Sequence, residues 1–159
     1  PVPEENVRIA SGDVLGWEAF PTPGHAVHHV SYLRGGTLLA GDAAGVRMPD
    51  ASYVLPVSPP PDLDVEVWHQ TVAAIRAREP ERLAVVHFGV HEDVEVHLDR
   101  VERELDRWAE RVRDEMEQDE FVAAARADAG DDADKYDRVA PLWQSWQGMR
   151  RYWEKRREA

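Results

Sequence analysis

The sequence predicts an α/β (α+β) protein, in which a strand-rich first part precedes a helical second part. Between residues 7 and 40, apolar residues alternate with polar ones or form short runs separated by turn residues, as is typical of strands. Residues 65–78 carry apolar residues at helical spacing, and a second stripe of this kind runs from Val94 to Met116. With 159 residues, the chain is long enough for one domain of ordinary size.

The strands of the first part are short and bounded by turn residues. We expect them at residues 7–9, 14–20, 30–33, 37–40 and 83–86, with a turn at 11–13. The segment Arg34-Gly35-Gly36 predicts a hairpin, because glycine adopts positive φ easily. A loop over 43–61 precedes the helix over 65–78, which Asp62 or Asp64 caps. The run at 83–86 is wholly apolar, which is typical of a strand buried on both faces.

The second part is predicted to be helical from Asp93, which occupies a capping position. The apolar stripe of the helix from Asp93 to Met116 fits either packing against its own domain or a coiled-coil contact with another chain, and we favour the first. Residues 121–129 continue as helix until Gly130. A last helix over 136–153 holds three of the six tryptophans, which suggests a packed face.

Composition excludes several classes of function. The chain has no cysteine, which rules out disulfides and thiolate metal ligands, and its net charge of −12 argues against a nucleic-acid partner. Most of this charge lies in residues 92–137, with 18 acidic and 7 basic side chains. The longest apolar runs fall far short of the ~20 residues that cross a bilayer, so no membrane partner is expected. The chain opens at Pro1 without an initiator methionine or a signal peptide, so we expect a cytoplasmic protein that is processed or is part of a longer one.

Histidine and aspartate side chains follow three of the predicted strands. The segment Thr22-Pro23-Gly24-His25-Ala26-Val27-His28-His29 follows the second, Gly41-Asp42 follows the fourth, and His87-Phe88-Gly89 ends the run at 83–86. In layered α/β folds, sites are built at this edge of the sheet. A lone histidine at a strand end is more often structural, but two imidazoles and a carboxylate together suit zinc, iron or manganese.

These segments resemble the metallo-β-lactamase-fold hydrolases, of which the glyoxalase II-like proteins are one branch. The resemblance is carried by Thr22-Pro23-Gly24-His25 with His28-His29, then by Gly41-Asp42 and His87-Phe88-Gly89, and it covers about residues 5–105. It implies a four-layer αββα sandwich with two metal ions at the edge of its sheets. By motif, His25 would bind the first metal, Asp42 would bridge both as the catalytic carboxylate, and His87 would bind the second.

The resemblance also implies a reaction, the hydrolysis of an ester, thioester, amide or phosphodiester in a small-molecule substrate by a metal-bound hydroxide. Metal binding lowers the pKa of water to about 7, which provides a nucleophile at neutral pH. Zinc is the expected metal of the intact enzyme, with iron or manganese as alternatives. Antibiotic hydrolysis is not expected, because β-lactamases of this fold often use a cysteine where this chain has Asp42.

One family motif is absent from the sequence. The leading motif H-x-H-x-D-H, which supplies the remaining ligands, occurs nowhere in the chain. We therefore expect residues 1–92 to form the C-terminal half of a metallo-hydrolase domain, followed by a helical extension over 93–159. Such a fragment would bind metal weakly and be inactive alone. One face of its sheet would be bare, so we expect a second copy or the missing half as a partner.

The remaining candidates rest on position alone. They are His28 and His29, as partners of His25 or its metal, His91 near the site, and Tyr53 and Arg47 as substrate contacts from the loop. His69 and His97 lie on predicted helices, where surface or packing roles are expected. Two other functions stay open: an iron-dependent redox member of the same fold, and a non-catalytic interaction module that uses the acidic helices and the basic tail.

Overall fold

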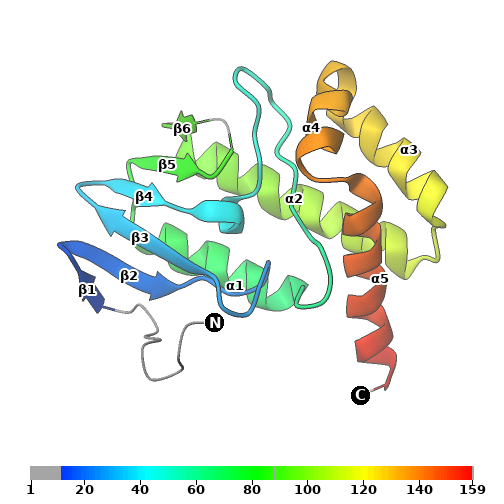
Figure 1. Ribbon diagram of the computed structural model, residues 1–159, viewed down its shortest axis with the longest axis horizontal. Coiled ribbons are helices and arrows are strands. Elements are labelled where there is room, and N and C mark those ends of the chain that lie inside the picture. The colour runs from blue at the N-terminus through cyan, green and yellow to red at the C-terminus, as the bar shows by residue number, and fades with distance from the viewer. Residues whose placement is uncertain (1–11, 88, 159) are drawn as a thin grey trace, which may run out of the picture.

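The computed structural model describes residues 12–87 and 89–158, which form a six-stranded sheet and a set of helices (Figure 1). The strands are β1 (Gly12–Val14), β2 (Trp17–Pro21), β3 (Val30–Arg34), β4 (Thr37–Leu39), β5 (Arg82–Val85) and β6 (Gly89–His91), in this order across the sheet. All neighbours are antiparallel except β4 and β5. The mixed α/β prediction is confirmed, while the strand expected at 7–9 lies outside the described residues.

The helices are α1 (Val65–Arg76), α2 (Val94–Arg113), α3 (Gln118–Ala129), α4 (Ala133–Val139) and α5 (Leu142–Glu158), with short 3₁₀ helices η2 (Gly41–Ala44) and η3 (Gly130–Asp132). Helix α1 makes the crossover that parallel strands β4 and β5 require. In Figure 1, α3, α4 and α5 gather at the end of the molecule away from the strands. Within the described part of the chain, no helix has the length and apolar character to span a bilayer.

Local structure corrects two of the strand expectations. The segment 14–20 is a hairpin rather than a single strand, because Leu15 and Gly16 both have positive φ and form its turn. Residues 12 and 13 accordingly belong to β1 and not to a turn. The hairpin at Gly35-Gly36 is confirmed, with φ of 52° and 72°.

The helix boundaries follow the expected capping chemistry only in part. Asp64 caps α1 by accepting a hydrogen bond from the Val67 backbone N–H at 3.1 Å, as predicted. Asp93 stands at the N-cap of α2, but its side chain makes no capping bond, which corrects the expectation. The helix expected over 136–153 is divided, because Ala140 is extended before Pro141 and α5 begins only afterwards.

The apolar stripe of α2 is buried within the chain's own core. Its buried apolar side chains are Val94, Leu98, Val101, Leu105, Trp108 and Val112. All of them except Val101 belong to one core with residues of α1 and α5, among them Trp68, Ile75 and Met149. Packing against its own chain, rather than a coiled-coil contact, therefore accounts for the stripe.

The sheet has one covered and one open face. On the covered face, Leu38 and its register partner Leu83 have no exposed surface and belong to the core with α1. On the open face, Leu39 of β4 is 40% exposed and Val90 of β6 is 56% exposed. Burial along β5 alternates for the same reason, since Ala84 is paired with both Leu39 and Val90 and is only half-buried. The prediction that this strand is buried on both faces is therefore wrong.

Candidate metal centre

The topology brings the three strand-end segments to one edge of the sheet. The loop 22–29 joins β2 to β3, and η2 follows β4 directly. Leu39 and Ala84 are register partners in parallel strands, and Asp42 and His87 each lie three residues beyond them. His87 occupies the turn between β5 and β6. The expected juxtaposition of these segments thus follows from the observed strand register.

His25 is held with one ring nitrogen directed at Asp42. Its Nδ1 lies 2.6 Å from the Val57 carbonyl oxygen, which can only accept, so Nδ1 carries the proton and donates. The Nε2 lone pair is therefore available, and Nε2 lies 3.9 Å from Oδ2 of Asp42. The side chain is 13% exposed, and its ring packs edge-on against Trp68. Metal-binding histidines commonly show this arrangement, in which the second ring nitrogen donates to a carbonyl.

The loop that carries His25 is docked on α1. Gly24 has φ of +121°, and a Cβ there would lie 2.4 Å from the Trp68 Cα, so only glycine fits without a backbone shift. The Gly24 carbonyl accepts from the Asp64 N–H at 2.9 Å, and the Pro23 carbonyl accepts from the Thr71 hydroxyl at 2.6 Å. These contacts fix the position of the imidazole before any ligand arrives.

Asp42 lies in η2 with one carboxylate oxygen unsatisfied. Its Oδ1 is buried and has no hydrogen-bond partner among the described residues. The turn around it is pinned, because the Ala43 carbonyl accepts from the Trp68 indole N–H at 2.7 Å. Leaving a buried acceptor unpaired costs about 1–3 kcal/mol and more for a charged group. The carboxylate is thus placed for a cation or a proton donor.

Comparison with known proteins bears on the fold. No sequence-family model and no curated protein matches the chain. Among solved structures, an archaeal metallo-β-lactamase superfamily protein from Sulfolobus tokodaii is similar, with 23% identity and a TM-score of 0.55 over 87% of this chain and 51% of that one. A metallo-β-lactamase family protein from Thermus thermophilus is also similar, with 17% identity and a TM-score of 0.61 over 98% of this chain and 50% of that one.

The fold is that of metallo-β-lactamase superfamily proteins. The chain spans about half the length of these two structures. The described residues are consistent with part of a metallo-β-lactamase fold followed by helices.

The donor set at this edge fits a divalent metal in part. His25 Nε2 and the Asp42 carboxylate are the nitrogen and oxygen donors that zinc accepts, and the unpaired Oδ1 of Asp42 needs such a partner. However, residues 12–87 and 89–158 include no group of three or more histidine, aspartate or glutamate side chains arranged to hold a metal. The edge therefore resembles part of a ligand set within the metallo-β-lactamase fold, rather than a closed site.

The adjacent histidines differ in their environment. His29 is half-buried beside His25, with ring centroids 6.0 Å apart, and its Nδ1 lies 2.7 Å from the Thr22 hydroxyl. Burial, and then the neighbouring His25, lower the pKa of His29. His28 is exposed. Of the two, His29 is the one whose ring contact with His25 is established.

His91 lies at the end of β6, beside α2. In the β5–β6 register His91 pairs with Leu83, and Leu83 lies four residues before His87. Its ring lies 5.1 Å from that of His97, which is buried in α2 and whose Nε2 donates to the Ala44 carbonyl at 2.8 Å. Burial lowers the pKa of His91. Its surroundings are those of a packed residue at the start of α2.

The two loop candidates, Tyr53 and Arg47, make contacts within the protein, and the Tyr53 hydroxyl is buried without a hydrogen-bond partner among the described residues. Tyr53 is buried, packs edge-on against Tyr136 and accepts from the Tyr136 hydroxyl through its carbonyl at 2.7 Å. Burial raises its pKa. Arg47 donates to both oxygens of Asp93 at 2.7 and 2.9 Å, and this hydrogen bonding lowers the pKa of Asp93. The same pairing explains why Asp93 does not cap α2.

Three polar groups at this edge of the sheet were not predicted from the sequence. They are the Val57 carbonyl, which orients His25, and the hydroxyls of Thr22 and Ser31, which lie 2.9 Å apart and are buried. A backbone carbonyl 32 residues away leaves no local signal in the sequence. Thr22 begins the Thr-Pro-Gly-His segment, and that position was the available signal.

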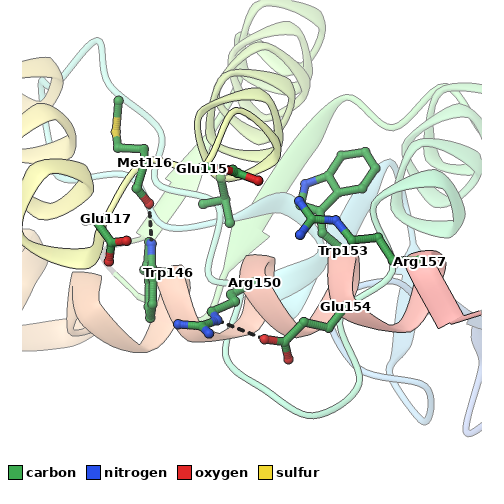
Figure 2. A pocket seen from close by; sticks show the side chains of 9 residues that line it. Glu115, Met116, Glu117, Trp146, Arg150, Trp153, Glu154 and Arg157 are labelled. Atoms are coloured by element: carbon green, nitrogen blue, oxygen red, sulfur yellow. Dashed lines mark hydrogen bonds and ion pairs between the residues drawn. The ribbon is translucent and has the colours of Figure 1, made fainter.

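A separate cavity of about 220 Å³ lies between the end of α2 and α5, as Figure 2 shows. It is lined by Val112, Glu115, Met116, Glu117, Trp146, Arg150, Trp153, Glu154 and Arg157. The indole N–H groups of Trp146 and Trp153 both donate to backbone carbonyls, and Arg150 pairs with Glu154 at 2.8 Å. Because these groups satisfy one another and none of the strand-end residues lines the cavity, it adds nothing to the candidate metal centre.

Proposed function

We propose that this chain provides the C-terminal ligand set of a metal-dependent hydrolase of the metallo-β-lactamase fold, similar to its glyoxalase II-like branch. In this proposal His25, Asp42 and His87 hold two divalent metal ions, most simply zinc. The remaining ligands come from a segment that carries H-x-H-x-D-H, which is absent from the 159 residues.

The unpaired Oδ1 of Asp42 is the observation that carries the proposal. It lies on a carboxylate whose other oxygen faces His25 Nε2 at 3.9 Å, and the His25 proton is committed to Val57 on the opposite side of the ring. Two acceptors thus face each other with no proton between them. Such a pair favours a cation, since a metal ion satisfies both lone pairs at once.

When bound, two metal ions at this edge would supply Lewis acidity and an acidified water for the hydrolysis of an ester, thioester or phosphodiester. The chain's own residues position this chemistry. The Val57 carbonyl holds the His25 imidazole in one tautomer, and the Trp68 contact with Ala43 fixes the turn of Asp42. The catalytic role of Asp42 is to offer both carboxylate oxygens from this rigid turn.

The open sheet face supports the need for a further segment. Leu39 and Val90 lie on it with 40% and 56% of their surface exposed, and Tyr32 and Ala84 complete the same row. A contiguous apolar row of this kind commonly marks an interface. We propose that a second sheet, from the segment with the missing ligands, covers this face, and that the chain alone is inactive.

Metal analysis and hydrolysis assays test the function. The protein that includes the H-x-H-x-D-H segment should contain two metal ions per chain and hydrolyse ester, thioester or phosphodiester substrates. Asp42→Ala should lose both properties, whereas Glu92→Ala, which removes an exposed carboxylate after β6, should keep them. A metal-free protein of unchanged activity would refute the proposal, and an iron-loaded protein that consumes oxygen would point to redox chemistry.

A non-catalytic interaction module remains the second candidate, because the same open face could serve binding alone. It predicts a stable oligomer of the 159-residue chain by light scattering and no metal uptake. Metal uptake that depends on Asp42 would exclude it.

A further inference from the structure

Three side chains form a hydrogen-bonded chain behind the candidate metal centre. His29 Nδ1 lies 2.7 Å from the Thr22 hydroxyl, which lies 2.9 Å from the Ser31 hydroxyl, which in turn lies 3.4 Å from the Ala40 carbonyl oxygen. Thr22 and Ser31 have no exposed surface. Two hydroxyls buried behind one imidazole are costly unless each proton has a fixed acceptor.

The direction of this chain follows from its last member. The Ala40 carbonyl can only accept, so the Ser31 hydroxyl donates to it. Ser31 then accepts from Thr22, and Thr22 accepts from His29. The proton of the neutral imidazole therefore lies on Nδ1, and the lone pair lies on Nε2.

The Nε2 atom of His29 is turned toward the turn that holds Asp42. A Cβ on Gly41 would lie 2.4 Å from it, so the imidazole edge rests directly on the Gly41 backbone, where φ is +56°. With the proton on Nδ1, this nitrogen can accept a hydrogen bond. His25 Nε2, the Asp42 carboxylate and His29 Nε2 thus present three acceptor groups at this edge of the sheet.

We propose that His29 is a positioning residue of this site, whose Nε2 accepts a hydrogen bond from a water or hydroxyl group held at Asp42. The inference rests on the proposed function and adds a residue to it. The Thr22 and Ser31 hydroxyls serve this role by keeping the proton on the far side of the ring.

Nitrogen-15 NMR of the imidazoles in the metal-free chain tests the tautomer directly. At neutral pH, His29 should be protonated at Nδ1. Thr22→Val, which removes the hydroxyl and keeps the shape, should shift His29 toward a mixture of tautomers, and Thr22→Ser should restore the Nδ1 proton. An Nε2-protonated His29 in the wild type, or no change in Thr22→Val, would overturn the inference.

Zinc titration tests the role in the site. His29→Gln should weaken zinc binding about tenfold, as loss of a supporting residue commonly does. His28→Gln, at the exposed neighbouring position, is the matched control and should bind zinc as the wild type does. Equal affinities of the wild type and His29→Gln would overturn the role of His29 and leave the proposed function intact. Absence of zinc binding in the wild type would instead contradict the proposed function, while the NMR result would still decide the tautomer.

Discussion

The two faces of the sheet carry similar side chains but differ in what covers them. On β4, Leu38 faces the helices and has no exposed surface, whereas its neighbour Leu39 faces the opposite way and is 40% exposed. Leu83 of β5 and Val90 of β6 show the same contrast. Apolar content alone therefore does not distinguish a face packed by its own chain from one available to another segment. The covered face shares its core with residues of α1 and α2, whereas Leu39 and Val90 are not part of that core.

The largest expected effect is on the covered face. Leu38→Ala should lower the free energy of unfolding by about 2–5 kcal/mol, because it leaves a cavity among fully buried neighbours. Leu39→Ala, one residue further on the open face, should cost less than about 1 kcal/mol. Urea unfolding of both variants measures the contrast. Similar losses at the two positions would show that the open face is also packed.

The covered side also holds a buried histidine whose titration affects stability. Burial lowers the pKa of His97 to about 4, despite its hydrogen bond to the Ala44 carbonyl. The unfolded chain, with a histidine pKa of about 6.5, takes up a proton that the folded chain does not. Stability should therefore fall between about pH 6.5 and 4, by on the order of 3 kcal/mol. Urea unfolding across this range measures it, and His97→Gln should flatten the dependence.

His69 on α1 is a control, because its contribution to stability changes with pH in the opposite direction to that of His97. Its pKa is raised because hydrogen bonds to Glu102 and Asp106 outweigh the effect of burial. Its contribution is therefore present below about pH 6.5 and is lost as the pH rises through the raised pKa. If the wild type and His97→Gln lose stability equally as the pH falls through this range, His97 is not the group responsible.

The smallest effect on stability is expected on the open face. Val90→Glu should change the free energy of unfolding by less than about 1 kcal/mol, because the side chain is 56% exposed. It should nevertheless abolish association through this face, since a charge would have to be buried there. Light scattering of wild type and variant tests this. Unchanged association would place the interface elsewhere.

Periodicity and turn chemistry predicted most of the elements. The α2 stripe and the Asp64 cap could be read from the sequence because both depend on residues a few positions apart. The hairpin at Leu15-Gly16 was hidden by its apolar neighbours, and the break at Pro141 was masked by a helical pattern that continued on either side. The exposure of the second face of β5 could not be predicted, because it depends on what covers the sheet.

The candidate site was predicted as strand-end residues, and the strand register shows which of them end at a common edge of the sheet. Asp42 and His87 follow neighbouring parallel strands, so their common edge is implied by the element order. The Val57 and Ser31 contacts come from long-range packing and had no such signal. His91 stays a prediction: the β5–β6 register pairs it with Leu83, and its ring lies beside that of His97.

A zinc titration of the 159-residue chain, monitored by calorimetry, tests most directly the central claim that Asp42 binds the metal. The account predicts weak but measurable binding that is lost in Asp42→Ala and kept in Glu92→Ala, because Asp42 supplies an unpaired Oδ1 on a carboxylate whose Oδ2 lies beside His25. Binding of equal strength in the wild type and Asp42→Ala would contradict it.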